Sequence, residues 1–302
     1  MEFNHIPVLL DECLEGLNIR PDGIYCDGTA GGAGHSREIA KRLDGEKGGR
    51  LVAIDRDPEA VKTATERLAG YPATVVRGNY SEIDEIFERL GISGADGILM
   101  DLGVSSYQLH NDAPLDMRMS GEGLSAKDVV NGYDYQSLAR IIFEYGEEKF
   151  SRSIASKIVK YREQKPIETT MELAEIIKSA VPQKARREKN PCKKTFQAIR
   201  IEVNKELEHL NIALDKAFDC LNVGGRLCII TFHSLEDRLV KQRFQSFCKG
   251  CICPPDFPQC ICGRTPRGKL VNRKPIEADE KELAENNRSR SAKLRVIEKI
   301  KD

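Results

Sequence analysis

Short apolar runs alternate with stretches of helical spacing along the first hundred residues of the chain. The runs that predict buried strands cover residues 23–26, 50–54, 74–77 and 97–100. Between them, residues 36–43, 57–68 and 81–90 repeat apolar side chains at intervals of three and four, which predicts helices. Asp57-Pro58 and Ser81-x-x-Asp84 are typical helix starts. Strands that alternate with helices predict a parallel sheet covered on both faces.

The next run that predicts a strand, residues 225–232, comes more than a hundred residues later. A parallel crossover needs only about a dozen residues, so most of this interval is an insertion. Its apolar stripes predict helices over residues 138–145, 154–159 and 169–177, followed by one long helix over residues 196–214. Residues 291–296 alternate apolar and basic side chains, which predicts an edge strand that closes the sheet.

The composition is that of an ordinary globular protein. The chain has 302 residues, of which 40% are hydrophobic and 31% charged, and its formal net charge is zero. No apolar run reaches membrane-spanning length, and the first residues lack a basic region followed by an apolar stretch. We therefore expect a cytoplasmic protein with no membrane partner.

Two basic segments stand out in this neutral chain. Residues 182–200 carry seven positive side chains and a single acidic one, and residues 263–274 carry five positive side chains and none that is acidic. A solvated charged face is the usual explanation of one such run. Two of them beside a group-transfer site favour contact with the phosphates of a nucleic acid.

The ten cysteines fall into two sets. Five are scattered, mostly in apolar surroundings, and are expected to act as small core residues in a reducing compartment. The other five are Cys248, Cys251, Cys253, Cys260 and Cys262. They supply enough thiolates for a zinc site, but the loop is short, rich in proline and without histidine. A reduced loop without metal is the favoured interpretation, so no metal ligand is assigned, and zinc at this loop is the alternative.

The glycine-rich segment from Asp27 to His35, followed by Asp55, carries the strongest chemical signal. It connects a predicted strand to a helix, and the second strand ends in a carboxylate, which is the layout of a nucleoside-binding βαβ unit. Glycines allow backbone to turn tightly and to approach a ligand without a Cβ in the way. The Asp55 carboxylate can accept hydrogen bonds from both ribose hydroxyls.

Details of this segment discriminate between cofactors. The strict G-x-G-x-x-G pattern of dinucleotide sites fails, because Arg37 occupies the last position. Asp27 precedes the glycines, where it would repel a diphosphate but would attract an ammonium or sulfonium group. S-adenosylmethionine carries both cations and no phosphate. A methyl donor is therefore favoured over a nicotinamide cofactor, although a structural turn in any α/β domain is the alternative explanation of the glycines.

Several stretches together match a known family in the expected order. The chain resembles the bacterial ribosomal RNA small subunit methyltransferase H family, which are 16S rRNA (cytosine-N4)-methyltransferases, essentially from end to end. The matching segments are His5–Leu10, Asp27–Ser36, Asp101–Ser106, Leu115–Met119, Thr195–Arg200, Phe232–Asp237 and Arg288–Ser291.

The resemblance implies a fold and a reaction. The fold is an α/β, Rossmann-like, seven-stranded S-adenosylmethionine-dependent methyltransferase core, here residues 1–110 and 204–302, interrupted by an inserted all-helical domain, residues 111–203, that we expect to recognise RNA. The reaction is methylation of the exocyclic N4 of one cytidine in the decoding region of 16S rRNA, within the small ribosomal subunit. The implied cofactor-binding residues are Ala33, Gly34, His35, Asp55, Tyr80, Asp101 and Gln108.

Two residues are candidates for the chemistry itself. Asp101 ends the fourth predicted strand, where ligands collect in open α/β sheets, and is a candidate hydrogen-bond acceptor. His233 follows the next strand and is a candidate neighbour of the target base, with a structural histidine as the alternative. Many amino-methyltransferases carry an Asp/Asn-Pro-Pro-aromatic motif after the fourth strand. Here that position reads Asp101-Leu-Gly-Val, which leaves the proton acceptor open.

Two further classes of protein are compatible with parts of the pattern. A nicotinamide-dependent dehydrogenase would use the glycine loop, but Asp27 and the missing last glycine oppose it. A non-catalytic nucleic-acid binder organised around a zinc loop would use the cysteines and the basic segments. Among methyltransferases, the residues alone leave DNA or protein substrates open, and only the family resemblance names ribosomal RNA.

Overall fold

The computed structural model describes residues 6–103, 113–188, 190–254, 259 and 261–302. The chain divides into two compact units: a sheet unit, Met1–Gly103 with Glu208–Asp302, and a helical unit, Val104–Leu207. Gln108, one of the predicted cofactor residues, lies outside the described residues. Among those described, no helix is both long and apolar enough to cross a bilayer.

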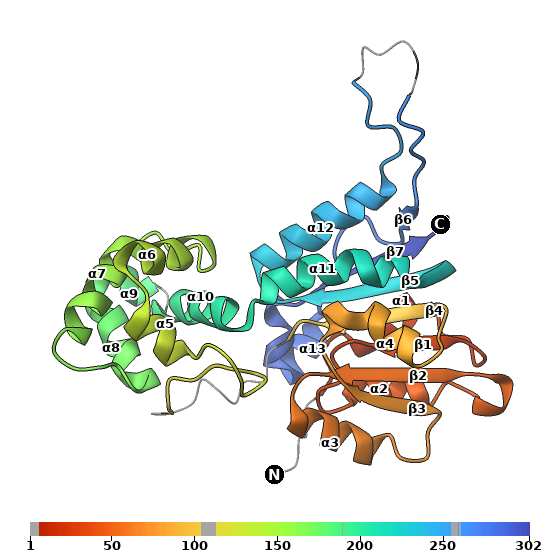
Figure 1. The fold of residues 1–302 in the computed structure, drawn as a ribbon, viewed down its shortest axis with the longest axis horizontal. Helices are drawn as coiled ribbons and strands as arrows, with labels where there is room; N and C mark the ends of the chain where they lie inside the picture. Colours follow the sequence, from red (N-terminus) through yellow and green to blue (C-terminus); the bar gives the residue numbers. More distant parts are fainter. Residues whose placement is uncertain (1–5, 104–112, 189, 255–258, 260) are drawn as a thin grey trace. The chain divides into compact units, whose positions relative to one another are not determined.

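The sheet unit is a seven-stranded mixed sheet in the order β3-β2-β1-β4-β5-β7-β6 (Figure 1). The strands β1 to β5 are parallel where they pair, and β7 is antiparallel to both β5 and β6. The strands are β1 (Ile24–Asp27), β2 (Arg50–Asp55), β3 (Ala73–Arg77), β4 (Ala95–Asp101), β5 (Leu221–Thr231), β6 (Gly268–Leu270) and β7 (Lys293–Lys299). The predicted α/β fold with a seven-stranded sheet is confirmed.

Helices cover both faces of this sheet, as the continuous apolar strands require. One buried cluster joins the sheet to α4, α11 and α12, and a second joins the opposite face to α1, α2 and α3. The helices are α1 (Leu10–Leu17), α2 (Gly34–Ala40), α3 (Pro58–Arg67), α4 (Ile83–Arg89), α11 (Glu206–Asp219), α12 (Ser234–Cys248) and α13 (Glu280–Glu285), with short 3-10 turns at Gly45–Lys47, Tyr80–Glu82 and Asn287–Ser291.

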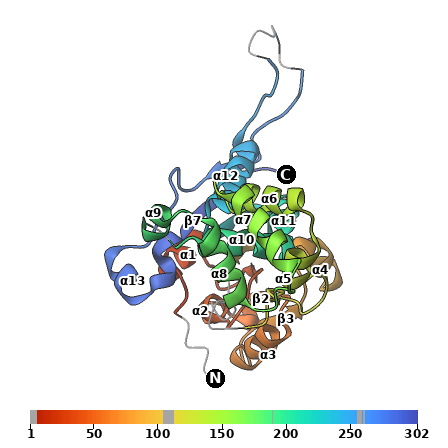
Figure 2. The same ribbon diagram turned by 90° about the vertical axis from the view of Figure 1, so that its left-hand side faces the viewer.

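The helical unit packs around its own core. Buried side chains of α5, α6, α7, α8 and α10 form one cluster, and these helices lie together in Figure 2. The helices are α5 (Ala126–Gly132), α6 (Tyr135–Glu144), α7 (Ser151–Arg162), α8 (Thr170–Ala180), α9 (Gln183–Glu188) and α10 (Cys192–Asn204). The buried Asn204 side chain accepts a hydrogen bond from Met119 N and donates one to Met117 O, which anchors the segment that precedes α5.

Three local predictions were wrong. The long helix over residues 196–214 is two helices, because Lys205 adopts a left-handed conformation with φ 50° between α10 and α11. Strand β7 is internal, since the unpredicted β6 forms the edge beside it. The capping box at the start of the 81–90 segment uses Asn79 and Glu82, two residues earlier than Ser81 and Asp84.

Candidate active site

Three carboxylates end three neighbouring strands of the sheet. Asp27, Asp55 and Asp101 are the last residues of β1, β2 and β4, and β1 pairs in parallel with both of the other strands. Carboxyl ends of parallel strands meet at one edge, where open α/β sheets bind their ligands. These three carboxylates therefore gather at one edge of the sheet unit.

The glycine loop is fastened to this edge by its backbone. Gly28 N donates to Leu99 O on β4, and Ala30 N donates to Ile54 O on β2, at 2.8 and 2.9 Å. A Cβ on Gly28 would lie 3.2 Å from the Cβ of Tyr80, and a Cβ on Gly34 would lie 2.7 Å from Pro7 Cγ. Close packing therefore explains why glycine occupies both positions.

Asp27 is buried within this loop, with 1% of its surface exposed. Its Oδ2 accepts from the Ser36 hydroxyl at 2.5 Å, and its Oδ1 accepts from Thr29 N at 3.0 Å. Burial raises the pKa of Asp27, while His35 and these hydrogen bonds act in the opposite direction. We expected Asp27 to contact the cationic part of a ligand. In the structure its buried carboxylate instead orders the loop.

Asp55 combines loop contacts with partial exposure. Its Oδ2 accepts from Gly31 N at 2.8 Å, and its Oδ1 accepts from Asp57 N at 2.9 Å. Burial raises the pKa of its carboxyl, and the two backbone hydrogen bonds lower it. Each carboxylate oxygen has a second lone pair, so Asp55 retains acceptor capacity at the strand end.

Asp101 and His35 lie next to each other at the same edge. His35 Nδ1 is 3.9 Å from Asp101 Oδ2, while His35 Nε2 lies 2.9 Å from Val8 O, which fixes Nε2 as the donor to that carbonyl. Asp101 Oδ1 accepts from Gly103 N at 2.9 Å. The side chain of Asp101 is 17% exposed and that of His35 is 7% exposed, so Asp101 is the more accessible of the two.

His233 has a structural environment. It is the N-cap of α12, where its Nδ1 accepts from Glu236 N, and its Nε2 lies 3.0 Å from Glu236 Oε1. Glu236 Oε2 in turn accepts from Phe232 N and His233 N, which completes a capping box. With Nδ1 bonded to the helix start and 8% of the side chain exposed, His233 has the geometry of a capping residue, although its buried Nε2 makes no hydrogen bond among the described residues.

The other predicted cofactor residues border the loop. Ala33 has φ 59° and is the N-cap of α2, Gly34 begins this helix, and Tyr80 follows β3 next to Gly28. Thr29 was missed by sequence analysis, although its hydroxyl accepts from Asp101 N at 2.6 Å and so joins the loop to β4. A hydroxyl residue two positions after an aspartate is a typical turn signal that indicates such contacts.

Both basic segments leave cations exposed among the side chains that the structure describes. In residues 263–274 the exposed cations are Arg264, Lys269, Arg273 and Lys274. Arg267 instead pairs with Asp219 at 2.6 Å and lies over the Phe218 ring. In residues 182–200 Lys184, Lys193 and Lys194 are exposed, whereas Arg200 pairs with Glu206 at 2.9 Å. Lys189 lies outside the described residues.

Comparisons with known proteins agree with the resemblance drawn from the motifs. The model of the MraW methylase family matches residues 2–300. A protein of Lachnospira eligens called ribosomal RNA small subunit methyltransferase H is 54% identical over 99% of both chains. One of Agathobacter rectalis, called ribosomal RNA small subunit methyltransferase H 2, is 56% identical over 99% of both chains. A crystal structure of an rRNA methylase from Streptococcus thermophilus has a TM-score of 0.44 at 11% identity, with both chains covered completely.

The predicted class, an S-adenosylmethionine-dependent methyltransferase, is thereby confirmed, and the dehydrogenase and the non-catalytic binder are set aside. Because the family model and these relatives span almost the whole sequence, the chain belongs to the MraW methylase family.

Proposed function

We propose that this protein transfers the methyl group of S-adenosylmethionine to the exocyclic N4 of one cytidine in the decoding region of 16S rRNA, in the cytoplasm. The names of relatives at 54–56% identity support a substrate in the RNA of the small ribosomal subunit. The observation that carries the proposal is the glycine loop fastened between β2 and β4, with Asp55 and Asp101 at the adjacent strand ends.

The residues at this edge fit S-adenosylmethionine. Asp55 retains acceptor capacity for the ribose hydroxyls. Ala33 and Gly34 offer backbone at the start of α2, and Tyr80, whose Cβ borders Gly28, is the residue whose ring we expect to flank the adenine. When bound there, S-adenosylmethionine supplies the electrophilic methyl group.

The task of the protein is then to prepare a poor nucleophile. The lone pair of cytosine N4 is delocalised into the ring, so hydrogen-bond acceptors must hold the amino group in a reactive orientation and a base must later remove a proton. We assign to Asp101 the role of hydrogen-bond acceptor from this amino group. His35 Nδ1 lies 3.9 Å from Asp101 Oδ2, so the imidazole borders this carboxylate.

We assign to His233 a structural role, which is to position the start of α12. Its contacts with Glu236 fix the start of α12 immediately after β5, and this arrangement does not need the ring to touch the substrate. Of the two candidates from the sequence, Asp101 is therefore the proposed catalytic residue.

The base must leave any stack before its N4 can meet the methyl donor, which favours RNA that is already unstacked within the small subunit. We propose that the exposed cations of residues 263–274 contact RNA phosphates, together with the basic segment of the helical unit. Aromatic residues are scarce in both segments, so backbone contact is favoured over base stacking.

The direct test is methylation of small ribosomal subunits that lack the modification, with a labelled donor and mapping of the modified nucleotide. We expect one labelled cytidine in the decoding region, and no label with the Asp101→Ala variant. Asp44→Ala is a matched control, because Asp44 lies in an exposed turn of the sheet unit and pairs with Lys47. Label at another base, or normal turnover of Asp101→Ala, would reject the corresponding part of the proposal.

A further inference from the structure

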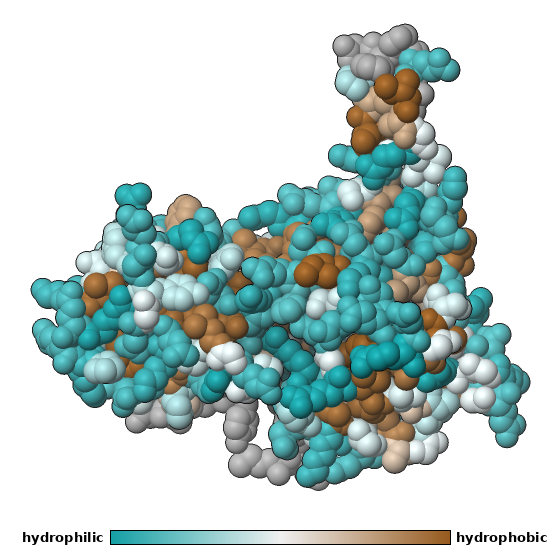
Figure 3. Space-filling view, in the orientation of Figure 1, coloured by the Kyte–Doolittle hydropathy of each residue, from teal (hydrophilic) through white to brown (hydrophobic). Residues whose placement is uncertain are grey.

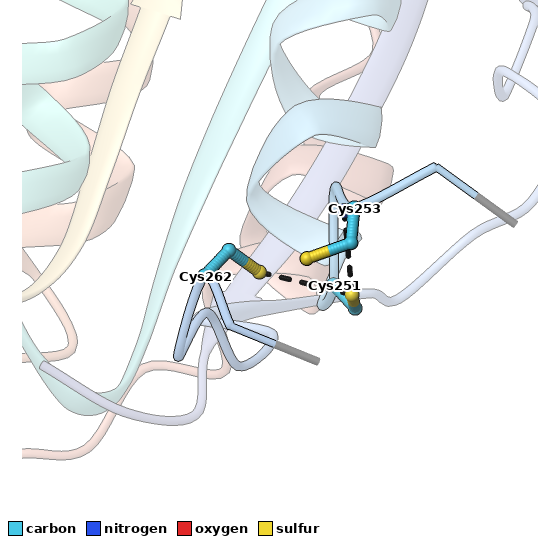
Figure 4. Close-up of side chains that lie close together, drawn as sticks. All are labelled: Cys251, Cys253 and Cys262. Atoms are coloured by element: carbon cyan, nitrogen blue, oxygen red, sulfur yellow. Dashed lines mark hydrogen bonds between the residues drawn. The ribbon is translucent and has the colours of Figure 1, made fainter. Parts of the chain in front are cut away.

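Three of the five clustered cysteines come together in space. The sulfur atoms of Cys251, Cys253 and Cys262 all lie within 4.8 Å of one another, and those of Cys251 and Cys262 are 3.7 Å apart. Figure 4 shows the side chains converging from two arms of the chain, with Cys251 and Cys253 on one arm and Cys262 on the other. Tetrahedral zinc with Zn–S bonds of about 2.3 Å requires sulfurs about 3.8 Å apart, close to this spacing.

Backbone amides point at two of these sulfurs. Ile252 N lies 3.5 Å from Cys262 Sγ, and Cys253 N lies 3.4 Å from Cys251 Sγ. Hydrogen bonds of this kind stabilise the negative charge of a thiolate and orient metal ligands. The three cysteines are exposed or partly exposed, so an ion has a path to them.

The fourth thiol of the described group lies elsewhere. Cys248 ends α12 and packs against the core of the sheet unit, and burial raises its pKa. Buried Cys228 is similar, with a pKa raised to about 12. A protonated thiol is a poor metal ligand, so burial separates these core cysteines from the exposed cluster. Cys260 lies outside the described residues.

The cluster lies on a segment in which no side chain of residues 249–254 and 261–267 is buried. Between α12 and β6 the chain runs out from the sheet unit and returns (Figures 1 and 2). Ile252 and Ile261 are 58% and 75% exposed, and Figure 3 shows apolar surface on the protruding segment. Small segments without a hydrophobic core need a cross-link or a metal to hold one conformation.

We propose that Cys251, Cys253 and Cys262 bind one Zn²⁺ as thiolates. Each thiol gives up one proton, and a fourth donor completes a tetrahedral shell. The ion ties the outgoing arm to the returning arm, which leads into the basic residues 263–274. Sequence analysis favoured a loop without metal, and the convergence of the sulfurs is what reverses that preference. The site is structural and is independent of the proposed methyl transfer.

The test measures the binding of Zn²⁺ to the full chain. The protein is purified under reducing conditions, stripped with a chelator and titrated with Zn²⁺ in competition with a chromophoric chelator. We expect one Zn²⁺ per chain, and Co²⁺ in its place should give thiolate charge-transfer absorption and tetrahedral visible bands. Cys251→Ala and Cys262→Ala should weaken binding by more than about 100-fold, because changes to outer-shell partners alone cost roughly 10–100-fold.

Cys248→Ala is the matched control, since it removes a thiol that lies three residues before Cys251 but outside the cluster, and it should leave Zn²⁺ binding unchanged. Circular dichroism and S-adenosylmethionine binding of each variant show whether the sheet unit is folded. Protease cleavage within residues 249–267 should slow when Zn²⁺ is added to the parent chain. No uptake of Zn²⁺ by the reduced chain, equal uptake by the cluster variants, or a disulfide that forms in place of metal binding would overturn the proposal.

Discussion

The Ser36 hydroxyl donates a hydrogen bond to Asp27 Oδ2 across 2.5 Å and so ties the first turn of α2 to the end of β1. Both residues are buried, so the carboxylate depends on protein donors for its hydrogen bonds. This pair holds the two ends of the glycine loop together, and the shape of the proposed cofactor site depends on it.

Replacing Ser36 with alanine should therefore destabilise the sheet unit. The change leaves a buried carboxylate oxygen without its donor, which costs about 1–3 kcal/mol. Urea unfolding measures the loss. Thr63→Ala is the matched control, because the Thr63 hydroxyl donates to Glu59 O on an exposed helix and its loss should stay within about 0.5 kcal/mol. Equal effects of the two changes would contradict the buried role of the pair.

The raised pKa of Asp27 predicts a pH dependence of stability. A carboxyl whose folded pKa lies above its ordinary value of 3.8 contributes most stability when protonated, and that contribution is lost as pH rises through the folded pKa. Asp27→Asn removes the buried charge and preserves the shape. We expect its free energy of unfolding, relative to the parent chain, to rise as the pH increases above the ordinary pKa of the carboxyl, 3.8. A constant difference over that range would show that burial does not penalise the charge.

Asp55 should be needed for binding of the methyl donor. Asp55→Ala removes the proposed acceptor of the ribose hydroxyls and should weaken S-adenosylhomocysteine binding by about 10- to 100-fold, as expected for one or two hydrogen bonds to a charged group. Calorimetry measures the affinity. In contrast, Asp57→Ala removes the N-cap of α3 and should cost about 1 kcal/mol of stability while leaving the affinity unchanged. If Asp57→Ala weakened S-adenosylhomocysteine binding more than Asp55→Ala did, Asp55 would not belong to the binding site.

His233 should be replaceable by another capping residue. His233→Ala should destabilise the protein by about 0.5–2 kcal/mol, whereas His233→Asn should restore most of this loss, because asparagine is a favourable N-cap. If the ring only positions α12, the asparagine variant keeps its single-turnover rate on saturating subunits. A rate that falls with both substitutions, although asparagine restores stability, would support a catalytic role for His233.

The exposed cations of residues 263–274 should contribute to RNA affinity. Charge reversal of Lys269, Arg273 and Lys274 should weaken binding to small subunits and flatten its dependence on salt, by about 0.7 in the logarithmic slope for each lost contact with a single-stranded phosphate. Lys47→Glu is the control, since Lys47 is an exposed cation in a turn between α2 and β2. An unchanged salt dependence would exclude this surface from RNA contact.

Periodicity of apolar residues was enough to predict β1 to β5, because those strands bury continuous apolar runs. The strand β6 was missed because it has three residues within a basic run, and its pairing depends on β7. The break at Lys205 has no glycine to signal it, although its φ of 50° is a conformation that glycine favours.

The candidate site was predicted in part for the same reason. Asp55 and Asp101 follow apolar strands, so their place at the sheet edge follows from the pattern. The burial of Asp27 and the capping role of His233 depend on Ser36 and Glu236, partners that only the folded chain defines and that no spacing pattern in the sequence indicates.

The pairing of β4 with β5 has a consequence for how the chain folds. Leu99 lies opposite Cys228, so two adjacent strands are separated along the sequence by the entire helical unit. Contacts between such distant residues form slowly, whereas α6, α7 and α8 are built from local contacts that form early. We expect amide protons of the helical unit to become protected in the first kinetic phase and those of β5 in a later one. Once the insertion is folded, fewer flexible residues separate β4 from β5, which lowers the entropic cost of pairing these two strands.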